Sequence, residues 1–132
     1  THVCAALDQS LAEHVAEGGV LARGARYQAN CEILVEGMRA LGFQTYLPDR
    51  DQAPIIVTFL TPADPNFEFQ KFYDALHRRG FVIYPGKLTR IDSFRIGCIG
   101  DLHAADMRGA LQAITEVLVE MGVEDRSPAV TG

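Results

Sequence analysis

The chain has 132 residues and a mass of 14.5 kDa, with 48% hydrophobic and 22% charged residues, which is typical of one globular domain. Its net charge of −5 argues against nucleic acid or an anionic membrane as a partner, because both attract positive surfaces. No apolar run approaches the ~20 residues that cross a bilayer, and no secretory signal opens the chain. Because the first residue is Thr1, we expect a fragment or a processed product. The three cysteines lack the spacing of a disulfide framework, so we expect a location in the cytoplasm.

Two helices are expected in the first third of the chain. Residues 3–15 place an apolar side chain at every fourth position, until Gly18-Gly19 interrupts the pattern. Residues 20–41 place apolar side chains at alternating spacings of four and three, which predicts an amphipathic helix of about six turns. Gly42 stands where a C-terminal cap of this helix belongs.

Two strands and a helix are expected in the middle of the chain. A short strand over 43–47 would end at Pro48, and the β-branched run 55–60 predicts a buried strand. Aromatic and apolar residues at helical spacing predict a third helix over 69–76, capped by Gly80.

Two further strands and a last helix are expected after that. The strands cover 81–84 and 94–99, and the Tyr-Pro-Gly-Lys sequence at 84–87 fits a type II turn with positive φ at Gly86. Asp101 is a plausible start of the last helix. The order of elements favours an α+β fold, in which a small, mostly antiparallel sheet carries helices on one face and leaves the other face free.

The cysteines and histidines indicate neither a disulfide framework nor a metal site. Cys4, Cys31 and Cys98 are odd in number and far apart, so we expect three reduced core cysteines. The four histidines share no ligand spacing. Motifs for an activated nucleophile or for a phosphate-binding loop are also missing from the sequence.

Arg95 is the main candidate for chemistry. Because side chains alternate along a strand, Arg95 and Gly97 should face away from the core. Their neighbours should enter it: Phe94, Ile96 and Cys98. An arginine on the free face can bind a carboxylate or a phosphonate through paired hydrogen bonds. The structural alternatives are an exposed arginine on an edge strand or an ion pair with Asp92 or Asp101.

The two lysines and one tyrosine near this segment are weaker candidates. Lys71 and Lys87 are both expected to be solvated, whereas a cofactor-bound lysine needs a buried setting. Tyr84 has two possible positions: its hydroxyl points toward the site of Arg95, or its ring packs in the core. From these residues alone, the chain lacks a catalytic apparatus.

The segments around Arg95 carry a family resemblance. Residues 80–87 (GFVIYPGK), together with FRIG at 94–97 and IGD at 99–101, resemble the 2-aminoethylphosphonate–pyruvate transaminases, a family of class V, fold-type I aminotransferases. The resemblance extends from Thr1 to about Gly122. It includes further segments at 17–19 (EGG), 25–27 (ARY), 37–43 (GMRALGF) and 54–56 (PII).

The resemblance implies that residues 1–132 form the C-terminal small domain of a homodimeric enzyme that depends on pyridoxal phosphate, with 1–19 as a connecting helix. Residues 124–132 are expected to form a frayed tail from their sequence alone. An N-terminal domain would supply the Schiff-base lysine and most cofactor contacts. This chain alone would then be inactive and without bound cofactor. The implied reaction converts 2-aminoethylphosphonate and pyruvate to phosphonoacetaldehyde and alanine.

The resemblance also assigns site residues. Arg95 would bind the acidic group of each substrate. Tyr84, Gly86 and Lys87 would lie near that site without a firm role.

Two other functions stay open. The parent enzyme could be another class V aminotransferase, of the alanine or serine–glyoxylate or pyruvate type. A cysteine desulfurase is less favoured because Cys98 is expected in a core strand. The chain could also be a free-standing module that binds an anionic metabolite through Arg95.

Overall fold

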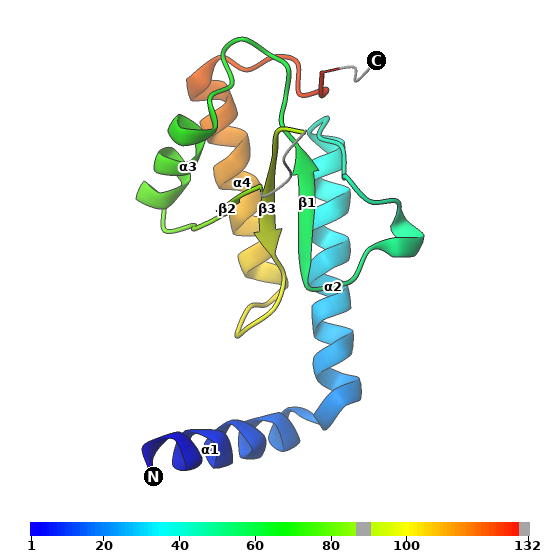
Figure 1. Cartoon of the computed structure of the whole chain (residues 1–132), viewed down its shortest axis with the longest axis vertical. Helices are drawn as coiled ribbons and strands as arrows, with labels where there is room; N and C mark the ends of the chain where they lie inside the picture. Colours follow the sequence, from blue (N-terminus) through cyan, green and yellow to red (C-terminus); the bar gives the residue numbers. More distant parts are fainter. Residues whose placement is uncertain (87–90, 130–132) are drawn as a thin grey trace.

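The computed structural model describes residues 1–86 and 91–129 (Figure 1). The predicted helices are confirmed, and those after residue 18 lie on one side of a small sheet. Along the chain the elements are α1 (His2–Glu17), α2 (Gly19–Ala40), a 3-10 turn (Asp49–Asp51), β1 (Ile56–Leu60), α3 (Phe69–Arg78), β2 (Tyr84–Pro85), β3 (Ser93–Gly97) and α4 (Ala104–Met121).

The sheet is antiparallel, with β3 in the centre between β1 and β2. In Figure 1, α2 and α4 lie behind the sheet, and α3 packs against α4. The opposite face carries no helix of the described chain, and we call it the outer face. The structure therefore confirms the predicted α+β class with helices on one face.

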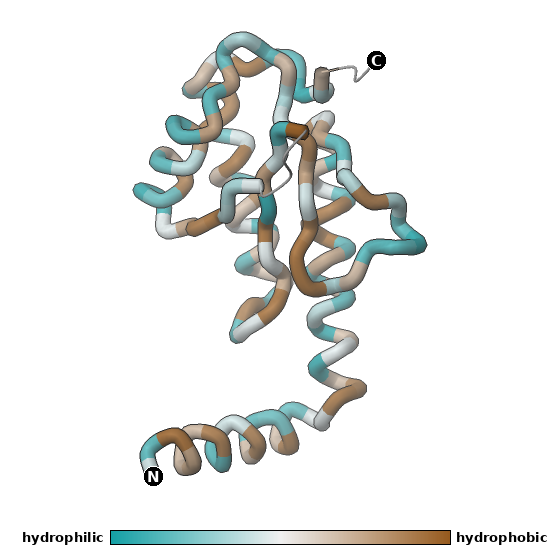
Figure 2. Tube along the Cα trace, viewed as in Figure 1, coloured by the Kyte–Doolittle hydropathy of each residue, from teal (hydrophilic) through white to brown (hydrophobic). Residues whose placement is uncertain are grey.

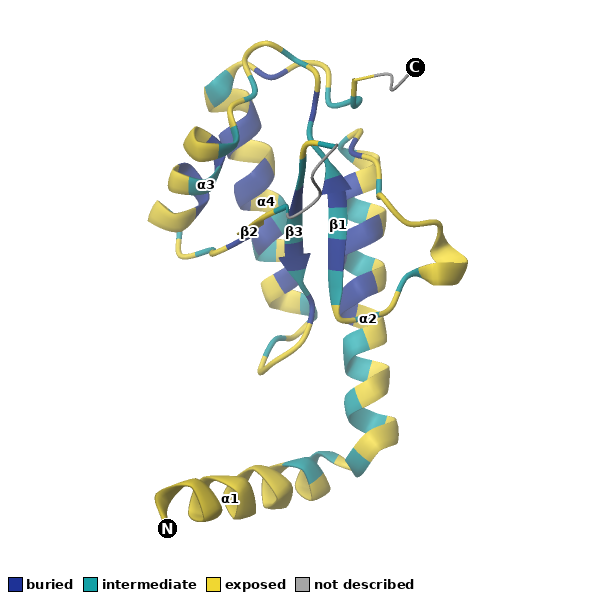
Figure 3. Ribbon diagram, viewed as in Figure 1, coloured by how far each residue is buried: buried dark blue, intermediate teal, exposed yellow. Residues whose placement is uncertain are grey.

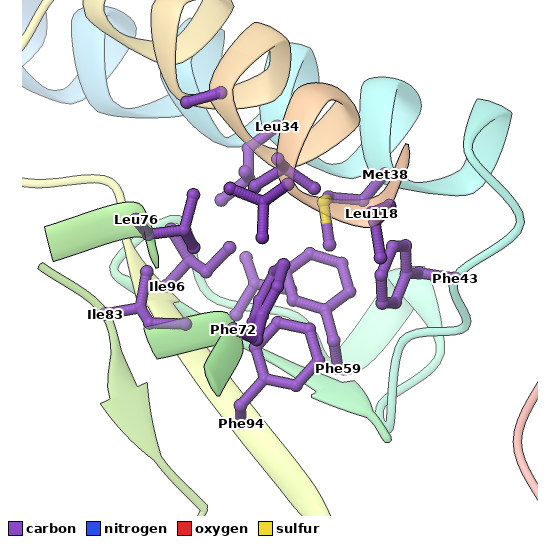
Figure 4. Packing of buried hydrophobic residues seen from close by; sticks show 14 of the residues in the cluster. Leu34, Met38, Phe43, Phe59, Phe72, Leu76, Ile83, Phe94, Ile96 and Leu118 are labelled. Carbon is purple, nitrogen blue, oxygen red and sulfur yellow. The ribbon is translucent and has the colours of Figure 1, made fainter. Parts of the chain in front are cut away.

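The core lies between the sheet and the helices (Figure 4). Phe94 is fully buried at its centre, because alternation along β3 directs this ring toward the helices. Its ring centroid lies 5.6 to 6.3 Å from those of five other phenylalanines: Phe43, Phe59, Phe67, Phe69 and Phe72. These rings come from both sheet and helix segments, so one cluster joins the two layers.

Two predicted strands are shorter than expected. The segment 43–47 forms a single antiparallel bridge, between Thr45 and Phe59, before the chain turns away at Pro48 into the 3-10 turn. The strand predicted over 81–84 is reduced to β2, because pairing with β3 begins only at Tyr84.

The type II turn predicted at 84–87 is wrong. Gly86 has no positive φ, and its N–H donates to the Ser93 carbonyl (2.8 Å), which continues the pairing of β2 with β3. A Cβ at Gly86 would overlap with that carbonyl oxygen, so glycine is needed here for close approach. Lys87 lies outside the described residues.

Helix α4 begins after His103, and the start predicted at Asp101 is wrong. The His103 backbone N–H donates to the Asp106 carboxylate (2.8 Å), so the cap is formed by the residue three positions into the helix. Gly100, with a φ of 98°, turns the chain between β3 and this cap.

The segment after α4 was expected to fray, but its described part is hydrogen-bonded. The Asp64 carboxylate accepts the backbone N–H groups of Glu124 and Asp125 (2.9 and 3.0 Å). The Ala63 N–H also donates to the Ser127 carbonyl (2.9 Å). Backbone N–H groups, first that of Asn66 and then those of Asp125 and Glu124, hold the pKa of Asp64 below its usual value.

Helix α1 extends away from the rest of the molecule, and none of its residues is buried (Figure 3). Cys4 is therefore exposed, which corrects the prediction of three core cysteines. Cys31 and Cys98 are buried as expected, and burial raises the pKa of Cys98 to about 12. Within the described residues, no helix combines the length and the apolar character that crossing a membrane requires.

The ring cluster predicts the effect of truncating Phe94. We expect Phe94→Ala to lower the free energy of unfolding of this chain by about 3–5 kcal/mol, because it leaves a cavity among the other rings. Urea denaturation measures this difference. Val119→Ala is the control, since Val119 is 71% exposed and its truncation should cost less than about 0.5 kcal/mol. Equal losses in the two variants would contradict the role of the cluster.

Candidate anion-binding site

Arg95 lies on the outer face of the central strand. Its neighbours Phe94 and Ile96 are buried on the helix side, as the alternation predicted. Thr58 of β1 and Tyr84 of β2 are its direct cross-strand partners. An arginine is therefore flanked on both sides by residues that carry a hydroxyl group.

The guanidinium of Arg95 is oriented by the backbone of β2. Its Nε donates to the Pro85 carbonyl (3.2 Å), and no ion pair joins Arg95 to a carboxylate of the described residues. Asp101, one of the two predicted structural partners, instead lies 3.4 Å from the His103 ring. The terminal nitrogens of Arg95 can therefore bind two oxygens of an anion side by side.

Two outer-face residues next to Arg95, Tyr84 on β2 and Gly97 along β3, both border solvent-accessible space. Tyr84 is 50% exposed on the outer face and does not pack in the core. A Cβ at Gly97 would meet no atom within 4 Å, so the space beside the strand is open there. Tyr84 is thus brought together with Arg95, and Gly86 lies one residue beyond β2.

An apolar groove of about 440 Å³ lies close to this face without including Arg95. It lies between residues 80–83, which precede β2, and the strand β3, and it extends to α4. Its walls include Phe81, Val82, Ile96, Gly97, Ile99 and Met107. Tyr84 and Gly97, which flank Arg95, also line this groove, so the groove adjoins the candidate anion site.

The chain beyond β3 is held by side chains of α2. Arg26 Nη1 donates to the carbonyls of Gly100 (2.7 Å) and Leu102 (2.8 Å). The buried Asn30 donates to the Cys98 and Leu102 carbonyls (3.2 and 2.8 Å). The end of the strand that carries Arg95 is thereby fixed to the longest helix.

Glu17 joins this anchor to the end of α1. One carboxylate oxygen accepts from Arg26 Nε and the other from Arg23 Nε, both at 2.6 Å. Hydrogen bonds from Arg26 and then Arg23 lower the pKa of Glu17 to about 2. Sequence reasoning missed these contacts, although the i, i+4 spacing of Arg26 and Asn30 put both residues on one face of the predicted helix.

Comparison with known proteins gives sequence relatives, although no family model matches the chain. The chain is 53% identical over 124 residues to a protein of Cupriavidus taiwanensis and 52% identical over 128 residues to one of Rhizobium meliloti, each named 2-aminoethylphosphonate–pyruvate transaminase. The matches cover 94% and 97% of this chain. They cover only 33% of each relative, so the chain spans about a third of their length.

The chain is homologous to the C-terminal part of the 2-aminoethylphosphonate–pyruvate transaminases. A third relative, from Pseudomonas fluorescens, carries the same name and is 50% identical over 125 residues, which are 95% of this chain and 34% of the relative. The predicted resemblance is confirmed at this level.

Solved structures confirm the fold of this chain. A ureidoglycine–glyoxylate aminotransferase from Bacillus subtilis superposes with a TM-score of 0.80 at 19% identity, over 92% of this chain and 32% of that one. An aspartate aminotransferase from Thermus thermophilus gives 0.61 at 22% identity, over 74% and 27% of the two chains. The small-domain fold of fold-type I aminotransferases is therefore established here.

The described residues of this chain do not fit a complete pyridoxal phosphate site. That cofactor requires a lysine amine at its aldehyde, an acidic partner at its ring nitrogen and donors for its phosphate. Lys71 is 71% exposed on α3 and pairs with Glu68 (2.7 Å), so it is solvated as expected. Lys87 lies outside the described residues. The described residues also contain no group of three or more side chains suited to a metal ion.

The depressed pKa of Glu17 predicts a pH-dependent stability. The ionised carboxylate stabilises the folded chain fully above its ordinary pKa of 4.5, and this contribution is lost as the pH falls toward about 2. We expect Glu17→Gln to lower the melting temperature at pH 7, and the difference from the wild type to shrink between pH 4.5 and 2. Thermal unfolding at several pH values measures this.

Glu13→Gln is the matched control. Glu13 lies on the same helix. Within the described residues, its carboxylate accepts a hydrogen bond from Gln9 and forms no ion pair. Its variant should differ little from the wild type at any pH. A Glu17→Gln difference that stays constant from pH 7 to pH 2 would contradict the assigned ion pairs.

Proposed function

We propose that this chain is part of an aminotransferase that transfers the amino group of 2-aminoethylphosphonate to pyruvate and forms phosphonoacetaldehyde and alanine. Identities of 50–53% to proteins named for this reaction, over at least 94% of the chain, support the proposal. Pyridoxal phosphate, held elsewhere in the longer enzyme, supplies the chemistry of amino-group transfer when bound. The segment described here supplies substrate binding.

Arg95 binds the acidic group of both substrates. The assignment depends on the position of the Arg95 guanidinium on the outer face. Its Nε donates to the Pro85 carbonyl, and no carboxylate of the described residues pairs with it. Each substrate carries an anionic group, and a fixed guanidinium sets the orientation of the substrate as well as its affinity. Neutral amines lack the group that it binds, so they would be poor substrates.

The remaining two thirds of the longer enzyme form the partner of α1. This helix exposes an apolar stripe at a spacing of four residues: Val3, Leu7, Leu11 and Val15, each 54–82% exposed (Figure 2). An isolated helix of 16 residues is marginal in water, so such a stripe needs a packing surface. Residues 1–19 then connect the two parts. A homodimer, a cytoplasmic location and inactivity of the isolated chain remain predictions.

Truncation of Arg95 tests the assigned role. In the full-length enzyme that contains this segment, Arg95→Ala should lower kcat/KM for 2-aminoethylphosphonate by roughly 100-fold or more, because two charge-assisted hydrogen bonds are lost. A coupled assay of alanine formation measures this value. Arg50→Ala is the control, since the Arg50 side chain is 84% exposed in the 3-10 turn.

Near-normal kinetics of Arg95→Ala would contradict the assignment. A panel of amino donors and acceptors on the wild-type enzyme separates the other possibilities. Turnover of alanine or serine with glyoxylate, without turnover of the phosphonate, would indicate another class V aminotransferase. Binding of an anionic metabolite without any transamination would indicate the free-standing module.

A further inference from the structure

We propose that Tyr84 makes this site selective for a phosphonate over a carboxylate, with its hydroxyl as the hydrogen-bond donor to the third phosphonate oxygen. This inference rests on the proposed function, because it assigns the substrate specificity of the same site. It depends on three features of the outer face: the direction of the Arg95 side chain, the register of β2 and β3, and the free hydroxyl of Tyr84.

Arg95 accounts for only two oxygens of a bound anion. Because its Nε is engaged by the Pro85 carbonyl, the edge formed by its two terminal nitrogens is the one left for a ligand. That edge presents two parallel N–H groups and matches the two oxygens of a carboxylate. A phosphonate is tetrahedral, so its third oxygen lies outside the guanidinium plane and requires a donor from another residue.

Tyr84 is placed to supply that donor. It is directly opposite Arg95 in the register, where the Cβ atoms of paired residues lie about 4.5–5.5 Å apart. The hydrogen bond to Pro85 draws the Arg95 side chain toward β2, the strand that carries Tyr84. A tyrosine side chain is long enough to bring its hydroxyl from this position to the guanidinium of its cross-strand partner.

The Tyr84 hydroxyl is also available. The side chain is 50% exposed, and its hydroxyl forms no hydrogen bond within residues 1–86 and 91–129. The other cross-strand partner, Thr58, is less suitable because its short side chain keeps the hydroxyl near the sheet. Thr58 also lies on the β1 side, whereas Arg95 is drawn toward β2.

The chain offers a matched control in Tyr46. The bridge of Thr45 to the buried Phe59 puts Tyr46 on the outer face, and the Tyr46 N–H donates to the Thr58 carbonyl (2.9 Å). Strand β1 therefore separates Tyr46 from Arg95. Tyr46 is 43% exposed, close to the value for Tyr84. A change to phenylalanine removes one phenolic hydroxyl at either position, so the two variants are chemically matched.

The experiment compares wild-type, Tyr84→Phe and Tyr46→Phe forms of the full-length enzyme. Each is assayed for kcat/KM with 2-aminoethylphosphonate and with pyruvate, and for inhibition by ethylphosphonate and by propanoate. Tyr84→Phe should lower kcat/KM for the phosphonate about 10-fold or more, and raise the inhibition constant of ethylphosphonate by a similar factor. In Tyr84→Phe, kcat/KM for pyruvate and the inhibition constant of propanoate should change less than about 3-fold. Tyr46→Phe should leave both kcat/KM values and both inhibition constants unchanged.

Equal losses for the phosphonate and carboxylate ligands, or unchanged values for all four, would overturn the role of Tyr84. A wild-type enzyme that does not use 2-aminoethylphosphonate would overturn the proposed function instead. The ethylphosphonate and propanoate constants would still test Tyr84 in that case, because they measure binding without turnover.

Discussion

The alternation of side chains along β3 determines both the core and the candidate site. Phe94 and Ile96 enter the helix side of the sheet, and the same backbone geometry directs Arg95 to the outer face. Because Phe94 is packed among rings from several segments, β3 cannot shift by one residue without exposing the centre of the core. The position of the guanidinium is therefore fixed by hydrophobic burial on the opposite side of the sheet.

Polar contacts add to this constraint at the two ends of β3. At its start, the close approach of Gly86 to Ser93 keeps β2 paired with the strand, so the Pro85 carbonyl stays within reach of Arg95. At its end, Arg26 and Asn30 bind the carbonyls that follow the strand. Glu17 extends this second set of contacts to the end of α1. The candidate anion site and α1 are thus both attached to α2.

Much of this arrangement could be predicted from local sequence patterns. Helical periodicity, the glycines at helix ends and the alternation at 94–98 involve residues close together in the chain, and the structure confirms all three. The family resemblance then favoured an anion site at Arg95, which the pattern alone left open between an anion site and an ion pair.

Features that depend on distant contacts were not predictable in this way. Arg26 binds carbonyls 74 and 76 residues away, and no local pattern shows such a partner. The glycine and proline of the 84–87 segment suggested a type II turn, but the tertiary approach of Ser93 decided the backbone conformation of Gly86. The start of α4 was misplaced for a different and local reason, because the cap is formed by Asp106 from within the helix.

The central claim is that Arg95 holds the acidic group of the substrate. A crystal structure of the full-length enzyme with 2-aminoethylphosphonate bound tests this most directly. The account predicts two phosphonate oxygens at hydrogen-bond distance, about 2.7–2.9 Å, from the terminal nitrogens of Arg95, with Nε still bonded to the Pro85 carbonyl. A phosphonate bound to other residues, with Arg95 facing solvent or paired to a carboxylate of the longer enzyme, would contradict it.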